Sequence, residues 1–148
     1  MGWVAALAAY REGQDWLDQV LVYLEANRDF MFDFVMKELP GLRMTRPEGT
    51  YLAWLDCRQA GIEGNPYEFF LHNARVALSD GAPFGRGGEG FVRLNFGCPR
   101  AMLTEALERM KKALLMGLGT GIGGLFIMRL AVDAATKYLH WQRLLPIN

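Results

Sequence analysis

The amino-acid sequence predicts an α/β (α+β) domain in which helices cover a small, mostly antiparallel sheet. Two segments, residues 15–39 and 99–114, carry apolar side chains at the three- and four-residue spacing of amphipathic helices. Between them, short runs of branched and aromatic residues alternate with glycine and proline turns, which is typical of short strands. Because each helix has one apolar face, we expect both helices to pack on the sheet as a second layer.

The first half of the chain begins with the long helix. We predict Asp15 as its N-cap, and Pro40–Gly41 ends it. Two strands are predicted next, at residues 42–45 and 50–56, separated by a Pro-Glu-Gly turn. The second of these strands is rich in aromatic and branched residues, which favour a pleated, half-buried surface.

The second half of the chain repeats the alternation of helix and strand. Proline at a helix start predicts a short helix over residues 66–73, followed by a strand at 76–79. The glycine-rich segment 81–90 is predicted as a mobile loop, and residues 91–96 as a strand. The helix at 99–114 carries basic residues near its end, where they suit the helix dipole.

Composition limits the classes of function. The chain has 148 residues, enough for one domain with a real core, and is 51% hydrophobic and 22% charged. Its 16 basic and 16 acidic residues cancel, which argues against a nucleic-acid partner. Cys57 and Cys98 lie far apart with no Cys/His cluster nearby, so we expect reduced core thiols and no metal site. We find no targeting signal and expect a cytoplasmic protein.

Arg93 is the residue that points most directly to a function. It lies inside the otherwise apolar strand 91–96. A guanidinium carries five donors, stays charged, and must be paired if it is buried. Its best partner is a planar carboxylate bound by two parallel hydrogen bonds. That partner could be a structural Asp or Glu such as Glu89, or the carboxylate of a small substrate.

A set of short motifs occurs in the order found in one enzyme family. The motifs are Tyr10-Arg11-Glu12-Gly13, Trp16-Leu17-Asp18, Tyr23-Leu24-Glu25-Ala26-Asn27-Arg28, Pro47-Glu48-Gly49-Thr50-Tyr51-Leu52-Ala53-Trp54-Leu55-Asp56, Leu78-Ser79-Asp80-Gly81, Phe84-Gly85 and Phe91-Val92-Arg93-Leu94-Asn95-Phe96. Together they resemble the C-terminal small domain of fold-type I enzymes dependent on pyridoxal phosphate (PLP). Within the class I/II aminotransferase superfamily, the chain is most similar to the MalY/PatB-type cystathionine β-lyase (C–S lyase) branch. The resemblance covers roughly residues 8–114.

The resemblance implies a specific chemistry. Enzymes of this family bind PLP through a lysine Schiff base and use the ring as an electron sink. The β-lyases remove the Cα proton of an L-cysteine conjugate and eliminate the thiol, leaving pyruvate and ammonia. An arginine on a small-domain strand grips the α-carboxylate of the substrate, and Arg93 occupies that position. The resemblance also implies a large PLP domain as partner and a homodimer in the full-length enzyme.

The chain departs from the family in two ways. Nothing matches the large domain, so we expect no catalytic, cofactor-binding or metal-binding residue here and no activity of the chain alone. Its lysines, which are Lys37, Lys111, Lys112 and Lys137, lie on predicted helices in the wrong context. The predicted organisation is a long linking helix at 1–40, the aminotransferase-like domain at 41–114, and an unmatched hydrophobic, glycine-rich helical tail at 115–148.

A second hypothesis stays open beside the first. The chain could be a non-catalytic α/β remnant that is oligomeric or membrane-associated through its tail. Residues 113–128 lack charge and include GxxxG spacing, which suits either close helix packing or a short membrane span. We favour the packed tail, because the uncharged stretch is short for a span.

Overall fold

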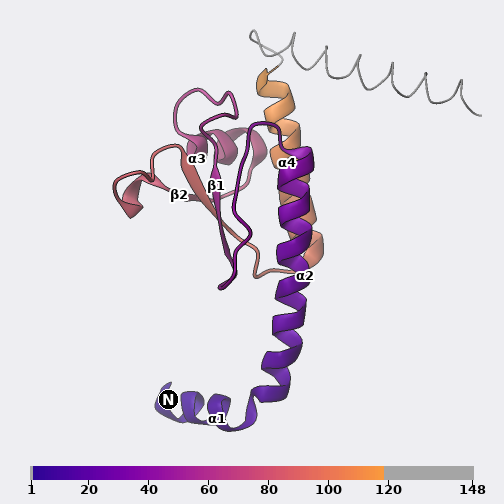
Figure 1. The fold of residues 1–148 in the computed structure, drawn as a ribbon. Helices are drawn as coiled ribbons and strands as arrows, with labels where there is room; N and C mark the ends of the chain where they lie inside the picture. Colours follow the sequence, from indigo (N-terminus) through magenta and orange to yellow (C-terminus); the bar gives the residue numbers. More distant parts are fainter. Residues whose placement is uncertain (1, 119–148) are drawn as a thin grey trace, which may run out of the picture.

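Two long helices back a three-stranded antiparallel sheet (Figure 1). The computed structural model of the protein describes residues 2–118. Its helices and strands are α1 (Gly2–Glu12), α2 (Gln14–Glu38), β1 (Leu52–Asp56), α3 (Pro66–Phe69), the π-helical turn η1 (Phe70–Ala74), β2 (Ser79–Asp80), the 3-10 turn η2 (Ala82–Phe84), β3 (Phe91–Asn95) and α4 (Arg100–Leu118). The predicted fold class is confirmed for these residues.

The sheet has the spatial order β1-β3-β2, and both pairs of strands are antiparallel. Side chains alternate across it, because successive residues of a strand point to opposite faces. On β1 and β3, Ala53, Leu55, Val92 and Leu94 are buried. The opposite face of these strands is half-buried or exposed, and we call it the open face.

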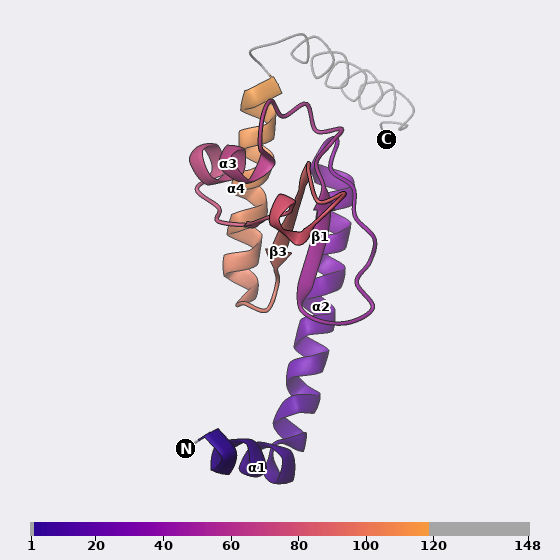
Figure 2. The same cartoon turned by 90° about the vertical axis from the view of Figure 1, so that its left-hand side faces the viewer.

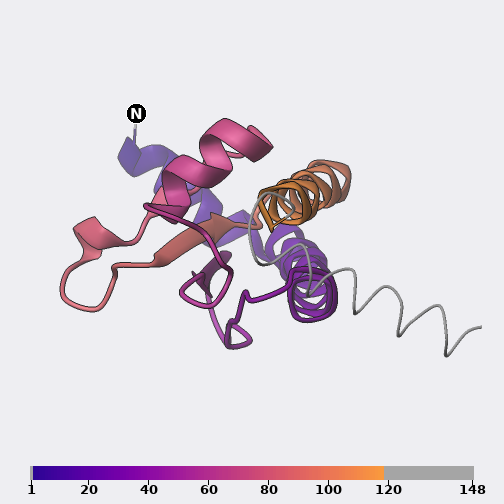
Figure 3. The ribbon, with the colours of Figure 1, turned by 90° about the horizontal axis from the view of Figure 1, so that it is seen from above.

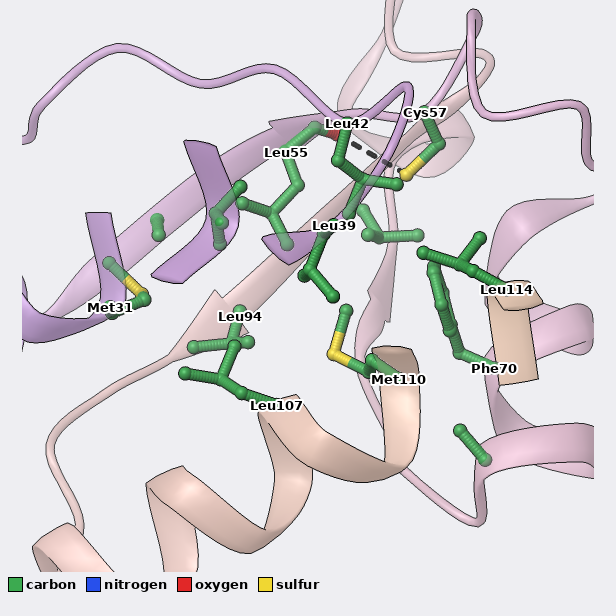
Figure 4. Close-up of a cluster of buried hydrophobic side chains, with 14 of the residues drawn as sticks. Met31, Leu39, Leu42, Leu55, Cys57, Phe70, Leu94, Leu107, Met110 and Leu114 are labelled. Carbon is green, nitrogen blue, oxygen red and sulfur yellow. Dashed lines mark hydrogen bonds between the residues drawn. The ribbon is translucent and has the colours of Figure 1, made fainter. Parts of the chain in front are cut away.

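Helices α2 and α4 cover the buried face of the sheet. Seen from above, they lie together on one side, and the turn η2 projects away from them (Figure 3). Their apolar faces form one core with the sheet and with Phe70 of η1; it includes Met31 of α2 and Leu107 and Met110 of α4 (Figure 4). Val35 of α2 belongs to the same core. Burial of each such side chain stabilises the fold by about 1.5–3 kcal/mol.

Two predicted strands are much shorter in the structure. Residues 42–45 form a single bridge, in which the backbones of Arg43 and Asp56 exchange hydrogen bonds of 3.0 and 2.8 Å. Pairing does not continue toward residue 50, since Pro47 has no N–H to donate and Thr50 has a positive φ of 64°. The predicted strand at 76–79 contributes only Ser79 to the two-residue strand β2.

The N-terminal 40 residues contain two helices and not one. Helix α1 ends before Gly13, which is the N-cap of α2, so the predicted N-cap Asp15 is wrong. Asp15 lies in the first turn of α2 instead, where its charge suits the helix dipole. Glycine permits the bend at residue 13, because in this backbone any side chain there would collide with the carbonyl oxygen of Ala9. Figure 2 shows α1 set across the end of α2, and no residue of α1 is buried.

Most of the predicted tail, 115–148, lies outside the residues that the structure describes. Helix α4 continues to Leu118, slightly beyond the predicted end at residue 114. Within residues 2–118, no helix combines the length and the apolar character that a membrane crossing requires.

We expect Gly41→Ala to destabilise the fold by about 2 kcal/mol. Gly41 has a φ of 79°, and a Cβ there would collide with the backbone of Gln59 and Ala60. The matched control is Gly49→Ala, because a Cβ at Gly49 would have no atom within 4 Å. The measurement is urea unfolding followed by circular dichroism, and equal stability of the two variants would contradict this account of the turn.

Candidate functional site

Arg93 lies at the centre of the open face. It is the middle residue of β3, which is itself the central strand of the sheet. Its direct neighbours across the strands are Trp54 on β1 and Ser79 on β2. The side chain is half-buried, so part of the guanidinium can be reached from solvent.

The contacts of Arg93 leave most of its hydrogen-bond donors unused by this domain. Nη2 of Arg93 donates to the hydroxyl oxygen of Ser79 at 3.4 Å, a long hydrogen bond. The guanidinium carbon lies 4.6 Å from the ring centre of Phe84. Within residues 2–118, no carboxylate oxygen of an Asp or Glu lies within 4.0 Å of a guanidinium nitrogen of Arg93, so the alternative pairing with Glu89 is not found. A planar carboxylate could therefore bind here with two hydrogen bonds.

Aromatic rings surround Arg93 on the open face. Trp54 meets the ring of Phe84 edge-on at 5.5 Å and stacks on Phe91 at 5.6 Å, with an interplanar angle of 16°. Ring pairs at these separations are favourable beyond the area they bury. Trp54 on β1, Phe91 on β3 and Phe84 in η2 thus form one cluster of rings beside Arg93, which we call the aromatic floor.

A second arginine on this side of the sheet is already paired. Arg58 donates to both carboxylate oxygens of Asp56, at 2.9 and 2.7 Å, and this hydrogen bonding lowers the pKa of Asp56. The Arg58 guanidinium also lies 4.7 Å from the ring centre of Phe91. A hollow of about 260 Å³ lies beside this pair, lined by Arg43, Met44, Thr45, Trp54, Asp56 and Phe91. Unlike Arg93, Arg58 forms its two hydrogen bonds to a carboxylate of this domain, that of Asp56.

The glycine-rich segment 81–90, predicted as a mobile loop, is a series of tight turns. The N–H of Phe84 donates to the carbonyl of Gly81 at 3.0 Å, and that of Gly88 to Gly85 at 3.1 Å. The segment closes on β3, because Phe91 donates to Gly88 at 3.1 Å and Gly81 donates to Phe91 at 3.0 Å. These bonds fix where Phe84 stands relative to Arg93.

The described residues do not fit a PLP site. A Schiff base needs a lysine facing the substrate, and no lysine within residues 2–118 shares the open face with Arg93. Lys37 pairs with Asp33 at 2.9 Å, and Lys111 pairs with Glu38 at 2.8 Å, both on helix surfaces. Lys112 is exposed on α4, and Lys137 lies outside the described residues. The cofactor implied by the resemblance therefore has no attachment point in this part of the chain.

Among the described residues, no cluster of metal ligands and no reactive thiol is found. Residues 2–118 contain no group of three or more His, Cys, Asp or Glu able to hold a metal ion. Cys57 and Cys98 are free thiols, as predicted. Burial raises the pKa of Cys57 to about 12 and also raises that of Cys98, so neither resembles a reactive thiolate.

A second hollow, of about 460 Å³, lies away from the candidate site. It is lined by Arg75, Val76, Ala77, Leu78, Leu94, Asn95, Gly97, Cys98, Met102, Leu103, Glu105, Ala106 and Arg109. Arg93 does not line it, although its strand neighbour Leu94 does, from the buried face. The hollow is therefore separate from the carboxylate-binding candidate.

One structural residue was missed by the sequence analysis. Asn27 on α2 is fully buried, although it is polar. Its Nδ2 donates to the carbonyls of Phe96 and Cys98 at 3.0 and 2.9 Å, and its Oδ1 accepts from Nε of Arg100 at 2.7 Å. Asn27 thus ties α2 to the segment joining β3 to α4. Its spacing of four residues from the buried Met31 was the available signal.

Comparison with known proteins shows which enzymes this chain resembles in sequence and structure. No family model matches the chain. Cystathionine beta-lyase PatB of Bacillus subtilis is 41% identical over 72% of this chain, and protein MalY of Escherichia coli is 38% identical over 74%. The PLP-bound C–S lyase of Staphylococcus hominis, solved in its external aldimine form with L-cycloserine, superposes with a TM-score of 0.70 at 35% identity over 74% of this chain. The chain is homologous to part of the PLP-dependent C–S lyases and aminotransferases.

The homologous region is a minor part of these enzymes. The chain spans 28% of the length of PatB, 28% of MalY and 29% of the S. hominis C–S lyase. The resemblance noted from the sequence motifs is thereby confirmed, together with PLP as the cofactor of the family.

Proposed function

We propose that this domain supplies the substrate-carboxylate side of the active site of a PLP-dependent C–S β-lyase. Arg93 binds the α-carboxylate of an amino-acid substrate such as an L-cysteine conjugate through two N–H···O hydrogen bonds. The observation that supports this is the lack of a carboxylate within 4.0 Å of Arg93 among residues 2–118, while Arg58 nearby has one. An accessible guanidinium without an internal anion suits an anionic ligand.

In this proposal the domain orients the substrate and does not carry out the bond-breaking chemistry. Two parallel hydrogen bonds fix both oxygens of the carboxylate and hence the direction of the bond to Cα. Binding energy is used in this way to orient the substrate. The aromatic floor formed by Trp54, Phe84 and Phe91 limits water around the ion pair. The cofactor, its lysine and the proton transfers belong to a large domain, as partner, and the chain alone is inactive. By the resemblance, the complete enzyme is a homodimer.

The test is a chimera that we call the reconstituted enzyme. In it, this chain's matching segment replaces the homologous segment of B. subtilis PatB, which is 41% identical over 108 residues. We expect the reconstituted enzyme to release pyruvate from L-cystathionine, and the 148-residue chain mixed with PLP to release none. A reconstituted enzyme that binds PLP but lacks activity, beside an active parent, would contradict the proposal. Pyruvate release by the chain alone would contradict its dependence on a large domain.

A further inference from the structure

Phe84 is the aromatic residue in contact with the guanidinium of Arg93. We infer that Phe84 is a positioning residue: its ring, fixed by the 81–90 turns, sets the direction in which Arg93 presents its donors to the substrate carboxylate. This inference rests on the proposed function, because it concerns how the same arginine is held. Three observations support it: the distance of 4.6 Å between the Arg93 guanidinium carbon and the centre of the Phe84 ring, the exposure of that ring, and the backbone that holds it.

The exposure of Phe84 shows that its ring is not part of the hydrophobic core. Phe84 is 55% exposed, although it is a large apolar residue, and it is not part of the buried cluster. Its ring contacts are with Arg93 on one side and with the edge of Trp54 on the other. The contacts with Arg93 and with Trp54 are both favourable, and they orient the exposed ring.

The backbone of the 81–90 segment holds the ring in place. Gly81 and Gly88 approach each other so closely that a Cβ on either would collide with the carbonyl oxygen of the other. This contact pins the start of the 3-10 turn η2 against the residues that lead into β3. Phe84 in η2 is therefore held by the backbone that leads into β3, the strand that carries Arg93.

An aromatic ring is suited to holding an arginine that must bind a carboxylate. A structural Asp or Glu would occupy the same in-plane donors that the substrate needs. A ring attracts the face of the guanidinium and leaves the N–H groups at its edge free. Arg93 also loses less conformational freedom on capturing a substrate if it is already held, which increases affinity by pre-organisation.

The first experiment uses the full 148-residue chain with ¹⁵N-labelled arginine. We expect the Nε–Hε signal of Arg93, assigned by its loss in Arg93→Gln, to be shifted upfield by the ring current of Phe84. The shift should vanish in Phe84→Leu and persist in Phe84→Tyr, which keeps the ring. The matched control is Phe32→Leu, because Phe32 makes a similar contact with another arginine, Arg46, at 4.9 Å.

The second experiment measures kinetics in the reconstituted enzyme. We expect Phe84→Leu to raise KM for L-cystathionine about three- to tenfold with little change in kcat, from the usual strength of such contacts. Phe84→Tyr should restore the KM, and Phe32→Leu should leave it unchanged. A purely structural role would instead lower thermal stability and the active fraction without this separation of KM from kcat.

The outcomes separate this inference from the proposed function. An unshifted Arg93 signal in the native chain, or a KM for Phe84→Leu equal to that for Phe32→Leu, overturns the positioning role while Arg93 can still bind the substrate. If Arg93→Gln itself leaves KM unchanged, the proposed function of Arg93 fails, whatever Phe84 does. A raised KM in both Arg93→Gln and Phe84→Leu, with recovery in Phe84→Tyr, supports the inference.

Discussion

Replacing Arg93 by alanine in the reconstituted enzyme is expected to lower kcat/KM by an amount equivalent to about 2–5 kcal/mol, the usual loss when one partner of a hydrogen-bonded charge pair is removed. The loss arises because the substrate carboxylate would enter the site without its guanidinium. Arg93→Lys should recover only part of it, since an ammonium keeps the charge but not the planar fork. The measurement is steady-state pyruvate release over a range of L-cystathionine concentrations.

The same substitution should have little effect on folding. Arg93 makes one long hydrogen bond and one ring contact within the described residues, so its removal leaves no buried charge unpaired. The matched control is Arg58→Ala, which removes an arginine from the same side of the sheet that is already paired with Asp56. Unchanged kinetics of Arg93→Ala together with reduced thermal stability would show that Arg93 is structural.

The long elements of this fold could be predicted from the sequence. Helices α2 and α4 repeat their apolar positions over several turns, and β3 has a bounded apolar run. Residues 42–45 have similar local composition but make only one bridge, because strand pairing depends on where the chain goes after Pro47. The break at Gly13 depends on a close approach of the backbone to the Ala9 carbonyl that only glycine tolerates, and no periodicity reveals it.

The candidate site also has one part that the sequence predicts and one part that it does not. A charged residue in an apolar strand is visible in the sequence, and the structure places Arg93 on the open face without an internal carboxylate in the described residues. Its holder, Phe84, was not predictable, since glycine-rich segments carry little pattern and the position of the ring follows from the turns around Gly81 and Gly88. The local sequence thus indicates the candidate binding residue, Arg93, more readily than the contacts that orient its side chain.

Asn27→Ala is expected to lower the free energy of unfolding of the full chain by about 3–5 kcal/mol, since one buried and two part-buried hydrogen bonds are lost at once. The side chain bonds the carbonyls of Phe96 and Cys98 and Nε of Arg100, and it is fully buried. Asn27→Asp should be similarly costly, although it keeps the volume, because a carboxylate cannot donate to either carbonyl.

The matched control for Asn27 is Asn73→Ala. Asn73 also donates from Nδ2 to a backbone carbonyl, that of Phe69 at 2.9 Å, but it is exposed, so water can replace the bond. We expect its loss to cost less than about 1 kcal/mol. Urea unfolding of both variants measures the difference, and an Asn27→Ala protein as stable as Asn73→Ala would mean that the remaining contacts, such as the hydrogen bond from the Arg100 N–H to the Tyr23 hydroxyl at 2.6 Å, suffice to hold α2 to the β3–α4 connection. A large difference in the free energy of unfolding would instead show that the Asn27 hydrogen bonds are a main contact holding α2 behind β3, the strand that carries Arg93.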